Sequence, residues 1–344
     1  RDSESNLLGG IAKLVAASLL MTTTVTHAFT ERDRYNIPHI PQSPSLDGKI
    51  DEGIWKDAAT IELKYENNPG EGVPAPVKTV AYLYEDGKNL HVAIMAFDPE
   101  PEKIRGFLRD RDTLWNDDNV GMIIDTFNDE RSGYEFFVNP KGAQADMRMT
   151  DTNGWNEDES WDAIWDSAAA INDQGWAVEM TIPFNALRFP DADGELEWNI
   201  AMWRNYPRDV RHQMSNALLD RNKKCNLCQF DKAIGFASIE QGNNFQLTPT
   251  LTLGRSDSRE SEENEETGVH TMSEWEEGDD NKDVGLDLRW GVSQDMVVNA
   301  TINPDFSQVE TDSAQLDINS TYSLFYREKR PFFLDGADYF RSNN

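Results

Sequence analysis

Apolar and polar side chains alternate with a period of two along much of the chain, most clearly between residues 161 and 189. Four apolar side chains of the stretch 176–182 fall on one face: Trp176, Val178, Met180 and Ile182. A run of small residues, 164–171, precedes this stretch, and the turn at 172–175 contains a glycine that tolerates positive φ. The pattern predicts a β-hairpin that Pro183 ends, because proline has no N–H to donate. Its three tryptophans either fill a core or form a flat platform for a ligand.

Short strands separated by turn residues continue on both sides of this hairpin. We predict them at residues 77–85, 90–98, 120–127, 134–139, 143–149, 196–202 and 234–239. Many short strands, turn-rich joints and almost no helical period predict an all-β fold. The expected architecture is an antiparallel β-sandwich of the jelly-roll type over residues 45–240.

Three further alternating stretches follow, at residues 245–253, 284–290 and 296–302. The first two are linked by a long acidic loop, 256–283, with twelve Asp and Glu against two basic residues, whereas 291–295 is a tight turn. Long loops that alternate with tight turns are typical of outer-membrane barrels, although the edge of a soluble sandwich gives similar alternation. No charged residue falls on the apolar face of the three stretches, which favours the first strands of an incomplete β-barrel. The acidic loop is interpreted as a solvated linker.

Composition narrows the choice of partners. The 344 residues are enough for about two domains, and the hydrophobic fraction of 38% supports a sizeable core. The 62 acidic residues outnumber the 32 Lys and Arg and give a net charge of −30. Such a surface repels phosphate backbones, so nucleic acid is excluded as a partner, and neutral sugars or divalent cations are favoured.

The N-terminal residues predict export. Residues 1–28 combine a weakly basic start, an apolar run and a small-residue cleavage site, as in a signal peptide. The apolar run is too short to span a bilayer as a helix, and an amphipathic N-terminal helix is the alternative. Residues 29–44 then form a polar linker arm. Because the chain starts with Arg1 and stops without a terminal element, we expect it to be a fragment at both ends.

Cys225 and Cys228 are the two cysteines of the chain. In an oxidising compartment this spacing predicts a small local disulfide loop. Covalent haem attachment requires His after the second cysteine, where Gln229 stands. A zinc site would require two more ligands, and no His lies near.

Several segments carry a family pattern: LDGKIDEGIW (46–55), WNDDNVGMIIDTFNDERSGYEFFVNPKGAQAD (115–146), WDAIWDSA (161–168), GWAVEMTIPFNALRF (175–189) and WNIAMWRN (198–205). They resemble a family 9 carbohydrate-binding module, in the variant found at the head of bacterial outer-membrane proteins. The tail NPDFSQVETDSAQLDINSTYSLFYREKRPFFLDGADYF (303–340) resembles the start of the uncharacterised barrel domain DUF5916. The resemblance implies a β-sandwich that binds plant-type polysaccharides or their ends, related to haem-binding domains. It also implies a truncated DUF5916-type domain at 241–344.

One position departs from the family pattern. Sugar-binding members commonly carry an acidic residue beside the valine in the strand after the Asp pair. Here Gly121 follows Val120. The comparison therefore predicts that one hydrogen-bonding carboxylate is missing.

A pyranose presents an apolar face of C–H groups and a rim of hydroxyls, so a binding site requires an aromatic plate with polar groups at its edge. Core packing explains three tryptophans least well: Trp115, Trp155 and Trp203. The predicted carbohydrate site is completed by their polar neighbours: Arg111, Asp117, Asp118 and Arg204. The alternative for each tryptophan is a half-buried structural role. Trp55, Trp176 and Trp198 are assigned to the core.

The loop 151–158 spaces side-chain oxygens around Gly154 and is a weak calcium candidate. The proposed ligands are Asp151, Asn153, Asn156 and Asp158. The loop lacks the residue order and the distal glutamate of the helix–loop–helix motif, which favours a solvated turn instead. Calcium is the one cofactor that the sequence suggests.

Catalysis finds little support in the sequence. We find no nucleophile elbow, no zinc-protease motif and no phosphate-binding glycine loop. The favoured function is non-catalytic binding of an oligo- or polysaccharide by an exported envelope protein, which presents glycan at the cell surface or to an outer-membrane barrel. Alternatives are a glycoside hydrolase or accessory protein of carbohydrate catabolism, a haem- or metal-binding sandwich, and a purely structural module.

Overall fold

The computed structural model describes residues 32–303, apart from 152–153, 160, 191–193, 240–244, 256, 258, 260, 264–269, 277, 279 and 294–295. The predicted signal peptide, which stays a prediction, and nearly all of the DUF5916-like tail lie outside the described residues. Among the described residues, no helix is long and apolar enough to cross a membrane.

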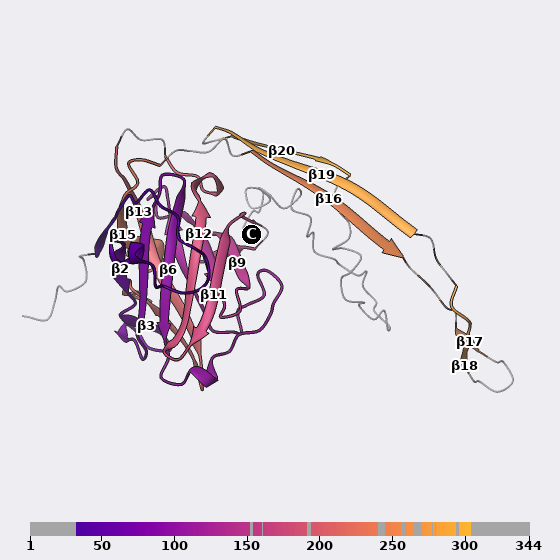
Figure 1. Ribbon diagram of the computed structural model, residues 1–344, viewed down its shortest axis with the longest axis horizontal. Helices are drawn as coiled ribbons and strands as arrows, with labels where there is room; N and C mark the ends of the chain where they lie inside the picture. Colours follow the sequence, from indigo (N-terminus) through magenta and orange to yellow (C-terminus); the bar gives the residue numbers. More distant parts are fainter. Residues whose placement is uncertain are drawn as a thin grey trace, which may run out of the picture. The chain divides into compact units, whose positions relative to one another are not determined.

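Two β-sheets pack face to face, which confirms the predicted sandwich (Figure 1). The larger sheet contains β1 (Arg34–Ile37), β3 (Tyr65–Asn68), β4 (Val73–Pro74), β7 (Asn119–Asp125), β8 (Ser132–Val138), β9 (Gln144–Thr150), β10 (Asn156–Asp158), β13 (Leu196–Pro207), β14 (Arg211–Ser215) and β15 (Asp231–Gly235). Its main path runs β10-β9-β8-β7-β13-β14-β3-β4, and β15 pairs with both β13 and β1.

The smaller sheet has the order β11-β12-β6-β5-β2. Its strands are β2 (Ala59–Glu62), β5 (Thr79–Glu85), β6 (Asn89–Phe97), β11 (Asp166–Asn172) and β12 (Gly175–Pro183). Short 3₁₀ turns lie at η1 (Gly53–Lys56), η2 (Pro101–Lys103), η3 (Phe184–Ala186) and η4 (Leu227–Gln229). The predicted hairpin is confirmed as β11 and β12, and the apolar face of β12 enters the core between the sheets.

The tryptophans near this hairpin fill the core and form no platform. Trp161, Trp165 and Trp176 are all buried, and the first two pack edge-on against Phe136 of the larger sheet. Burying large indoles supplies much of the apolar contact between the sheets. Trp55 and Trp198 are also buried, as predicted.

Some strand boundaries differ from the sequence prediction. The arm at 29–44 contributes β1, which pairs in parallel with β15 and buries Ile37 in the core. A four-residue strand has too little alternation to be recognised, and it forms here because β15 offers its backbone groups for pairing. β15 itself begins at Asp231, before the predicted stretch, and β13 continues to Pro207.

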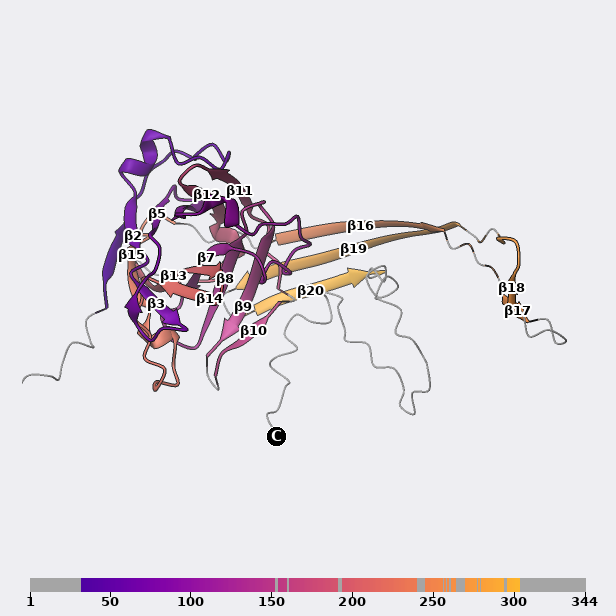
Figure 2. The same cartoon turned by 90° about the horizontal axis from the view of Figure 1, so that it is seen from below.

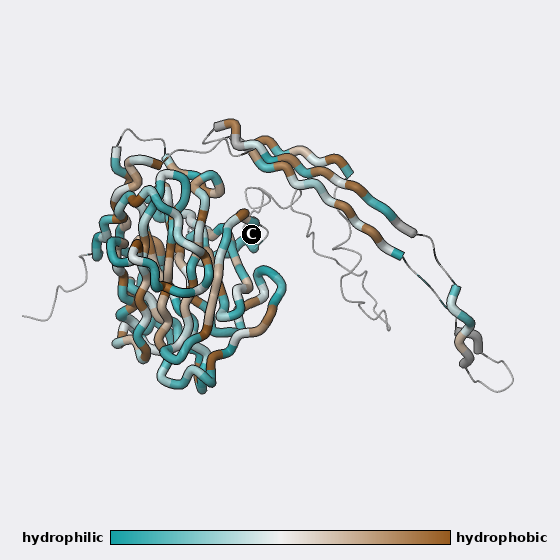
Figure 3. Tube along the Cα trace, in the orientation of Figure 1, coloured by the Kyte–Doolittle hydropathy of each residue, from teal (hydrophilic) through white to brown (hydrophobic). Residues whose placement is uncertain are grey.

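The alternating stretches after the sandwich form an antiparallel three-stranded sheet of β16 (Phe245–Arg255), β19 (Asp280–Ser293) and β20 (Met296–Ile302) (Figure 2). Apolar and polar residues alternate along all three strands (Figure 3). Cross-strand pairing places Leu251 opposite Val284. β19 starts earlier than predicted, so Lys282 faces Leu253 at the end of the apolar rows. Part of the predicted acidic loop forms a ribbon of β17 (Ser261–Glu263) and β18 (His270–Met272).

The segment 46–55 is held on the smaller sheet by Glu179 of β12. Its carboxylate accepts the backbone N–H of Asp47 and of Gly48, both at 3.0 Å, and the indole N–H of Trp55 at 3.3 Å. Burial raises the pKa of Glu179, while the two backbone hydrogen bonds oppose that rise. Gly48 has φ +78°, and an added Cβ would lie 2.7 Å from the backbone of Ala169. The close approach of two backbones therefore requires glycine here.

We predict that Gly48→Ala lowers the free energy of unfolding by at least about 2 kcal/mol more than Gly142→Ala. Gly142 has a similar φ of +82°, but an added Cβ meets nothing within 4 Å. The pair therefore separates backbone strain, common to both, from the clash at Gly48. Urea unfolding of both variants measures the difference, and equal losses would show that the segment does not lie against β11.

Candidate functional site

The larger sheet is apolar on both faces. Alternate residues of β7, β8 and β13 enter the core between the sheets, and the residues between them face the other way, together with the apolar residues of β9. The second set forms a separate buried cluster with residues of the covering loops: Leu114, Ile123, Phe137, Ala145, Met147, Met149, Ala201, Ala217, Leu227 and Phe230. We call this side of the sheet the outer face.

A pocket of about 460 Å³ lies on the outer face. Its aromatic lining consists of Trp115, Phe137, Trp155, Trp203 and Phe230. The polar lining consists of Glu135, Glu157, Glu159, Asn205, Arg211, Gln213 and Asn226. All three tryptophans predicted from the sequence therefore meet in one place, each half-buried. The size and the mixture of aromatic walls with a few polar groups are typical of small-ligand sites.

The floor of the pocket is set by strand register. Trp203 of β13, Gly121 of β7 and Phe137 of β8 are cross-strand partners in one row. An added Cβ at Gly121 would lie 2.1 Å from the carbonyl oxygen of Phe136 and 2.6 Å from the ring of Phe137. Trp115 packs edge-on against that ring, with 5.5 Å between ring centroids. The glycine that departs from the family pattern thus leaves room for the Phe137 ring.

Glu135 is a pocket residue that the sequence prediction missed. It pairs with Ile123 of β7 and Met147 of β9, and its side chain is 2% exposed. Its Oε1 has no hydrogen-bond partner among the described residues. Burial, together with the charge of Glu157, raises the pKa of Glu135 well above its ordinary value. The sequence did contain a signal for this residue, because Glu135 is an acidic residue between Tyr134 and Phe136 in an otherwise apolar part of β8.

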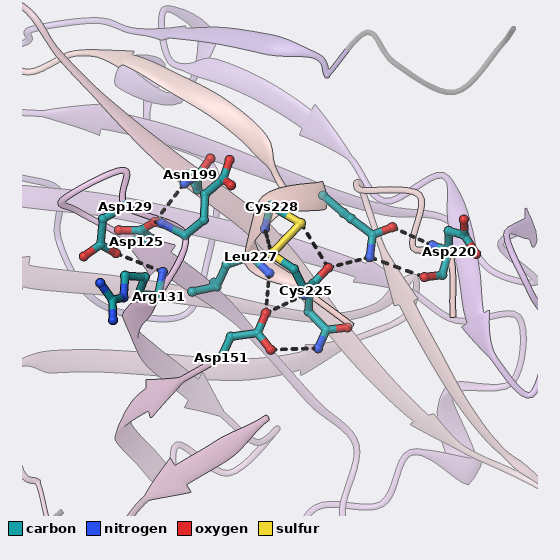
Figure 4. The surroundings of a disulfide bond; sticks show 12 residues. Asp125, Asp129, Arg131, Asp151, Asn199, Asp220, Cys225, Leu227 and Cys228 are labelled. Atoms are coloured by element: carbon teal, nitrogen blue, oxygen red, sulfur yellow. Dashed lines mark hydrogen bonds between the residues drawn. A yellow bond between two sulfur atoms is a disulfide. The ribbon is translucent and has the colours of Figure 1, made fainter. Parts of the chain in front are cut away.

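The disulfide loop shapes one wall of the pocket. Cys225 and Cys228 are joined, with 5.6 Å between their Cα atoms, which confirms the predicted bond (Figure 4). The carboxylate of Asp151 accepts the backbone N–H of Leu227 at 2.9 Å and that of Asn226. Asn226 lines the pocket, so this contact ties the wall to the end of β9.

Trp155 lies after Asp151 in the segment that leads to β10. Its indole N–H donates to Glu157 at 2.6 Å, and its ring lies 6.3 Å from that of Phe230. Phe230 directly follows the turn that holds the disulfide. The Trp155 indole therefore packs near the disulfide turn through its contact with Phe230.

Three of the four proposed calcium ligands lie in the described residues, and each takes part in other contacts. Asp151 is engaged by backbone N–H groups, and Asn156 and Asp158 belong to β10, which pairs with β9. Asn153 lies outside the described residues. Among described residues, Glu130, Cys225 and Cys228 bring three potential ligand atoms together, but the disulfide removes the thiolates that would bind a metal.

Comparison with protein families identifies two regions. Residues 46–216 match the family described as carbohydrate family 9 binding domain-like. The chain carries a family 9-like domain. Residues 267–344 match DUF5916, a domain of unknown function. No curated protein is significantly similar to the sequence.

Solved structures with a similar fold include a family 9 carbohydrate-binding module from Caldicellulosiruptor kristjanssonii in complex with cellotriose. It is 16% identical, with a TM-score of 0.43, and the match covers 58% of this chain and 92% of that one. A putative carbohydrate-binding protein from Bacteroides uniformis is 12% identical, with a TM-score of 0.48 and coverage of 59% and 99%. A glucose complex from C. kristjanssonii is 15% identical, with a TM-score of 0.42 and coverage of 58% and 94%.

Four predicted polar binding residues of the family 9-like domain serve its packing instead. Arg204 is fully buried on the face opposite to Trp203, where it donates to Thr79 Oγ1 and to the carbonyl oxygen of Phe97, both at 2.9 Å. Burial lowers its pKa to about 10. Neighbouring residues of a strand point to opposite faces, so Trp203 and Arg204 cannot share the pocket.

Arg111, Asp117 and Asp118 are engaged elsewhere as well. Arg111 donates to Gln144 Oε1 at 2.9 Å and to the Ala163 carbonyl at 2.8 Å. Asp117 forms an ion pair with Arg109, and Asp118 accepts from Arg208 and from the Arg105 backbone. Among the described residues, neither these three nor Arg204 line the pocket. The prediction chose them for nearness in sequence, which the fold does not preserve.

Glu135→Gln should change how the stability of the domain depends on pH. The raised pKa favours the protonated form of Glu135 in the folded state, whereas the unfolded carboxyl ionises near pH 4. The parent therefore loses stability as the pH rises above that value, and the amide variant does not. At pH 8 we expect the variant to melt at a higher temperature than the parent, which corresponds to at least about 1 kcal/mol of added stability. At pH 4 we expect the two proteins to melt at the same temperature. A melting difference that is independent of pH would show that Glu135 is solvated.

Proposed function

We propose that the family 9-like domain binds an oligo- or polysaccharide without catalysis, in the pocket bordered by Trp115, Trp155 and Trp203. The observation that carries this proposal is the convergence of the three indoles. They come from the turn before β7, the segment before β10 and the middle of β13, and they line one pocket on the outer face. The other tryptophans of the sandwich are buried in cores.

The lining supplies both kinds of contact that a sugar requires. Half-buried indoles offer apolar surface to the C–H face of a pyranose ring. Gln213 and Asn226 place side-chain amides at the same pocket, and Arg211 adds a guanidinium. Amides both donate and accept, as hydroxyl groups do, so they suit the rim of a neutral sugar. The family match over residues 46–216 supports the same assignment.

We also propose that residues 241–344 attach the domain to the outer membrane of the cell envelope. One face of the three-stranded sheet supports this part of the proposal. Leu251, Leu253 and Val284 are each about two-thirds exposed and lie in its apolar rows. The opposite face carries Thr250 beside Gly285 and Thr252 beside Asp283. An apolar face next to a polar face is the pattern of strands that separate lipid from water.

Trp115→Ala and Trp203→Ala should each weaken carbohydrate binding by about 1–3 kcal/mol, because each removes an aromatic wall of the pocket. Isothermal titration of the full chain against a panel of neutral and amino-sugar oligosaccharides measures the loss. Trp275→Ala is the matched control, since Trp275 is exposed and does not line the pocket. If both pocket variants stay folded and bind as tightly as the parent, the pocket is not the site.

Leu251→Lys should release the full chain from the outer-membrane fraction of a Gram-negative host, whereas Thr250→Lys should not. The two residues are neighbours on opposite faces of β16. A lysine on the lipid face of a membrane strand costs about 2–4 kcal/mol at mid-depth, and one on the polar face costs little. Quantifying the protein in carbonate-washed membranes distinguishes the variants. Equal retention would contradict a lipid-facing role for the apolar rows.

A further inference from the structure

Glu135 is an unusual group to find in the floor of a binding pocket. The residue is buried between Ile123 and Met147, and Oε1 has no partner among the described residues. Buried polar atoms are nearly always hydrogen-bonded, because leaving one unpaired costs free energy. Because the residue lines the pocket, a donor group of the ligand has access to its carboxyl group.

The charges around the pocket favour a positive ligand group. Its lining contains three acidic residues, Glu135, Glu157 and Glu159, against one cation, Arg211. The guanidinium of Arg211 already donates to Asn205 Oδ1 at 3.2 Å. The faces of the three tryptophans add to the attraction, because the indole π-system attracts cations. An anionic ligand would meet like charge on the carboxylate side of the pocket.

We propose that Glu135 makes this pocket selective for a sugar that carries a basic amino group, such as a hexosamine unit of a polysaccharide, over neutral hexoses and against hexuronates. This inference rests on the proposed carbohydrate binding. The ligand ammonium donates a hydrogen bond to the carboxylate of Glu135, which lines the pocket. The apolar face of the same sugar ring lies against an indole.

Gly121 explains why the acidic group of the pocket comes from β8 and not from β7. The ring of Phe137 occupies the space above Gly121, so no acidic side chain fits at that position of β7. Glu135 lies in the adjacent row, opposite Ile123, one strand further along the sheet. The acidic group of this pocket therefore comes from β8, where it is more deeply enclosed than a group at the rim.

Binding of an ammonium group in this pocket is coupled to the loss of a proton from Glu135. Burial and the charge of Glu157 raise the pKa of Glu135, so the empty pocket favours its carboxylic acid form. An ammonium group stabilises the carboxylate form and drives off that proton. The other charged groups facing the pocket are Glu157, Glu159 and Arg211. Affinity for an amino sugar should then rise with pH until the ligand amine itself loses its charge, while affinity for a neutral sugar stays level.

The test is titration of the full chain with four tetrasaccharides: β-1,4-linked glucosamine, its N-acetylated form, cellotetraose and tetragalacturonate. We expect the glucosamine tetramer to bind at least tenfold more tightly than its N-acetylated form, in which an uncharged acetamide replaces each ammonium. Tetragalacturonate should bind most weakly. Glu135→Gln should bring the ratio of the first two affinities towards one.

Glu62→Gln is the control for loss of one negative charge, because Glu62 is exposed on β2 of the other sheet. It should keep the ratio. Equal binding of the charged and N-acetylated tetramers by the parent, or an unchanged ratio in Glu135→Gln with a normal melting curve, overturns the selectivity and leaves carbohydrate binding intact. If no saccharide binds, both proposals fail.

Discussion

The pleat of β13, with its buried arginine, is the constraint on which the pocket depends. Consecutive residues of a strand face opposite sides of the sheet, and here both sides are buried. Trp203 reaches the pocket because Arg204 reaches the space between the sheets, where it donates to Thr79 and Phe97 of the smaller sheet. A slip of one residue would exchange the two side chains. The hydrogen bonds of Arg204 thus fix the register that aligns Trp203 with Gly121 and Phe137.

Burying the Arg204 guanidinium costs desolvation free energy, and the charged groups around it offset part of that cost. Asp98 lies 3.8 Å from Arg204, and Arg208 connects Asp98 to Asp118. The ring of Tyr206 lies 5.0 Å from the Arg204 guanidinium. Removing one member of such a network costs about 3–5 kcal/mol, because a charge is left buried without its partner. The aromatic pocket on the outer face therefore stands on a rigid support, which reduces the ordering cost of binding.

The sequence predicted the strands and singled out Trp115, Trp155 and Trp203 as tryptophans outside the core, because alternation and polarity are local properties. It misplaced Arg204, although alternation alone assigns it to the face opposite Trp203. Asp117 and Asp118 could not have been excluded, since their partners Arg109, Arg105 and Arg208 are brought together by the fold. The calcium candidate stays a prediction. Asn156 and Asp158 gain strand pairing with β9, which no local pattern of oxygens reveals.

Glu135 shows what a position-by-position transfer from a family misses. The acidic residue expected beside Val120 is absent, and that position alone suggests a weakened site. The neighbouring strand carries a carboxyl in the next row, and the glycine leaves room for Phe137 between the aromatic walls. In a sheet, positions that are distant in sequence but adjacent across strands present side chains to the same ligand. Residues of one strand can therefore form the aromatic walls of such a pocket while another strand supplies its polar group. A buried polar group discriminates strongly between ligands, because a ligand that does not pair with it leaves it without a hydrogen bond.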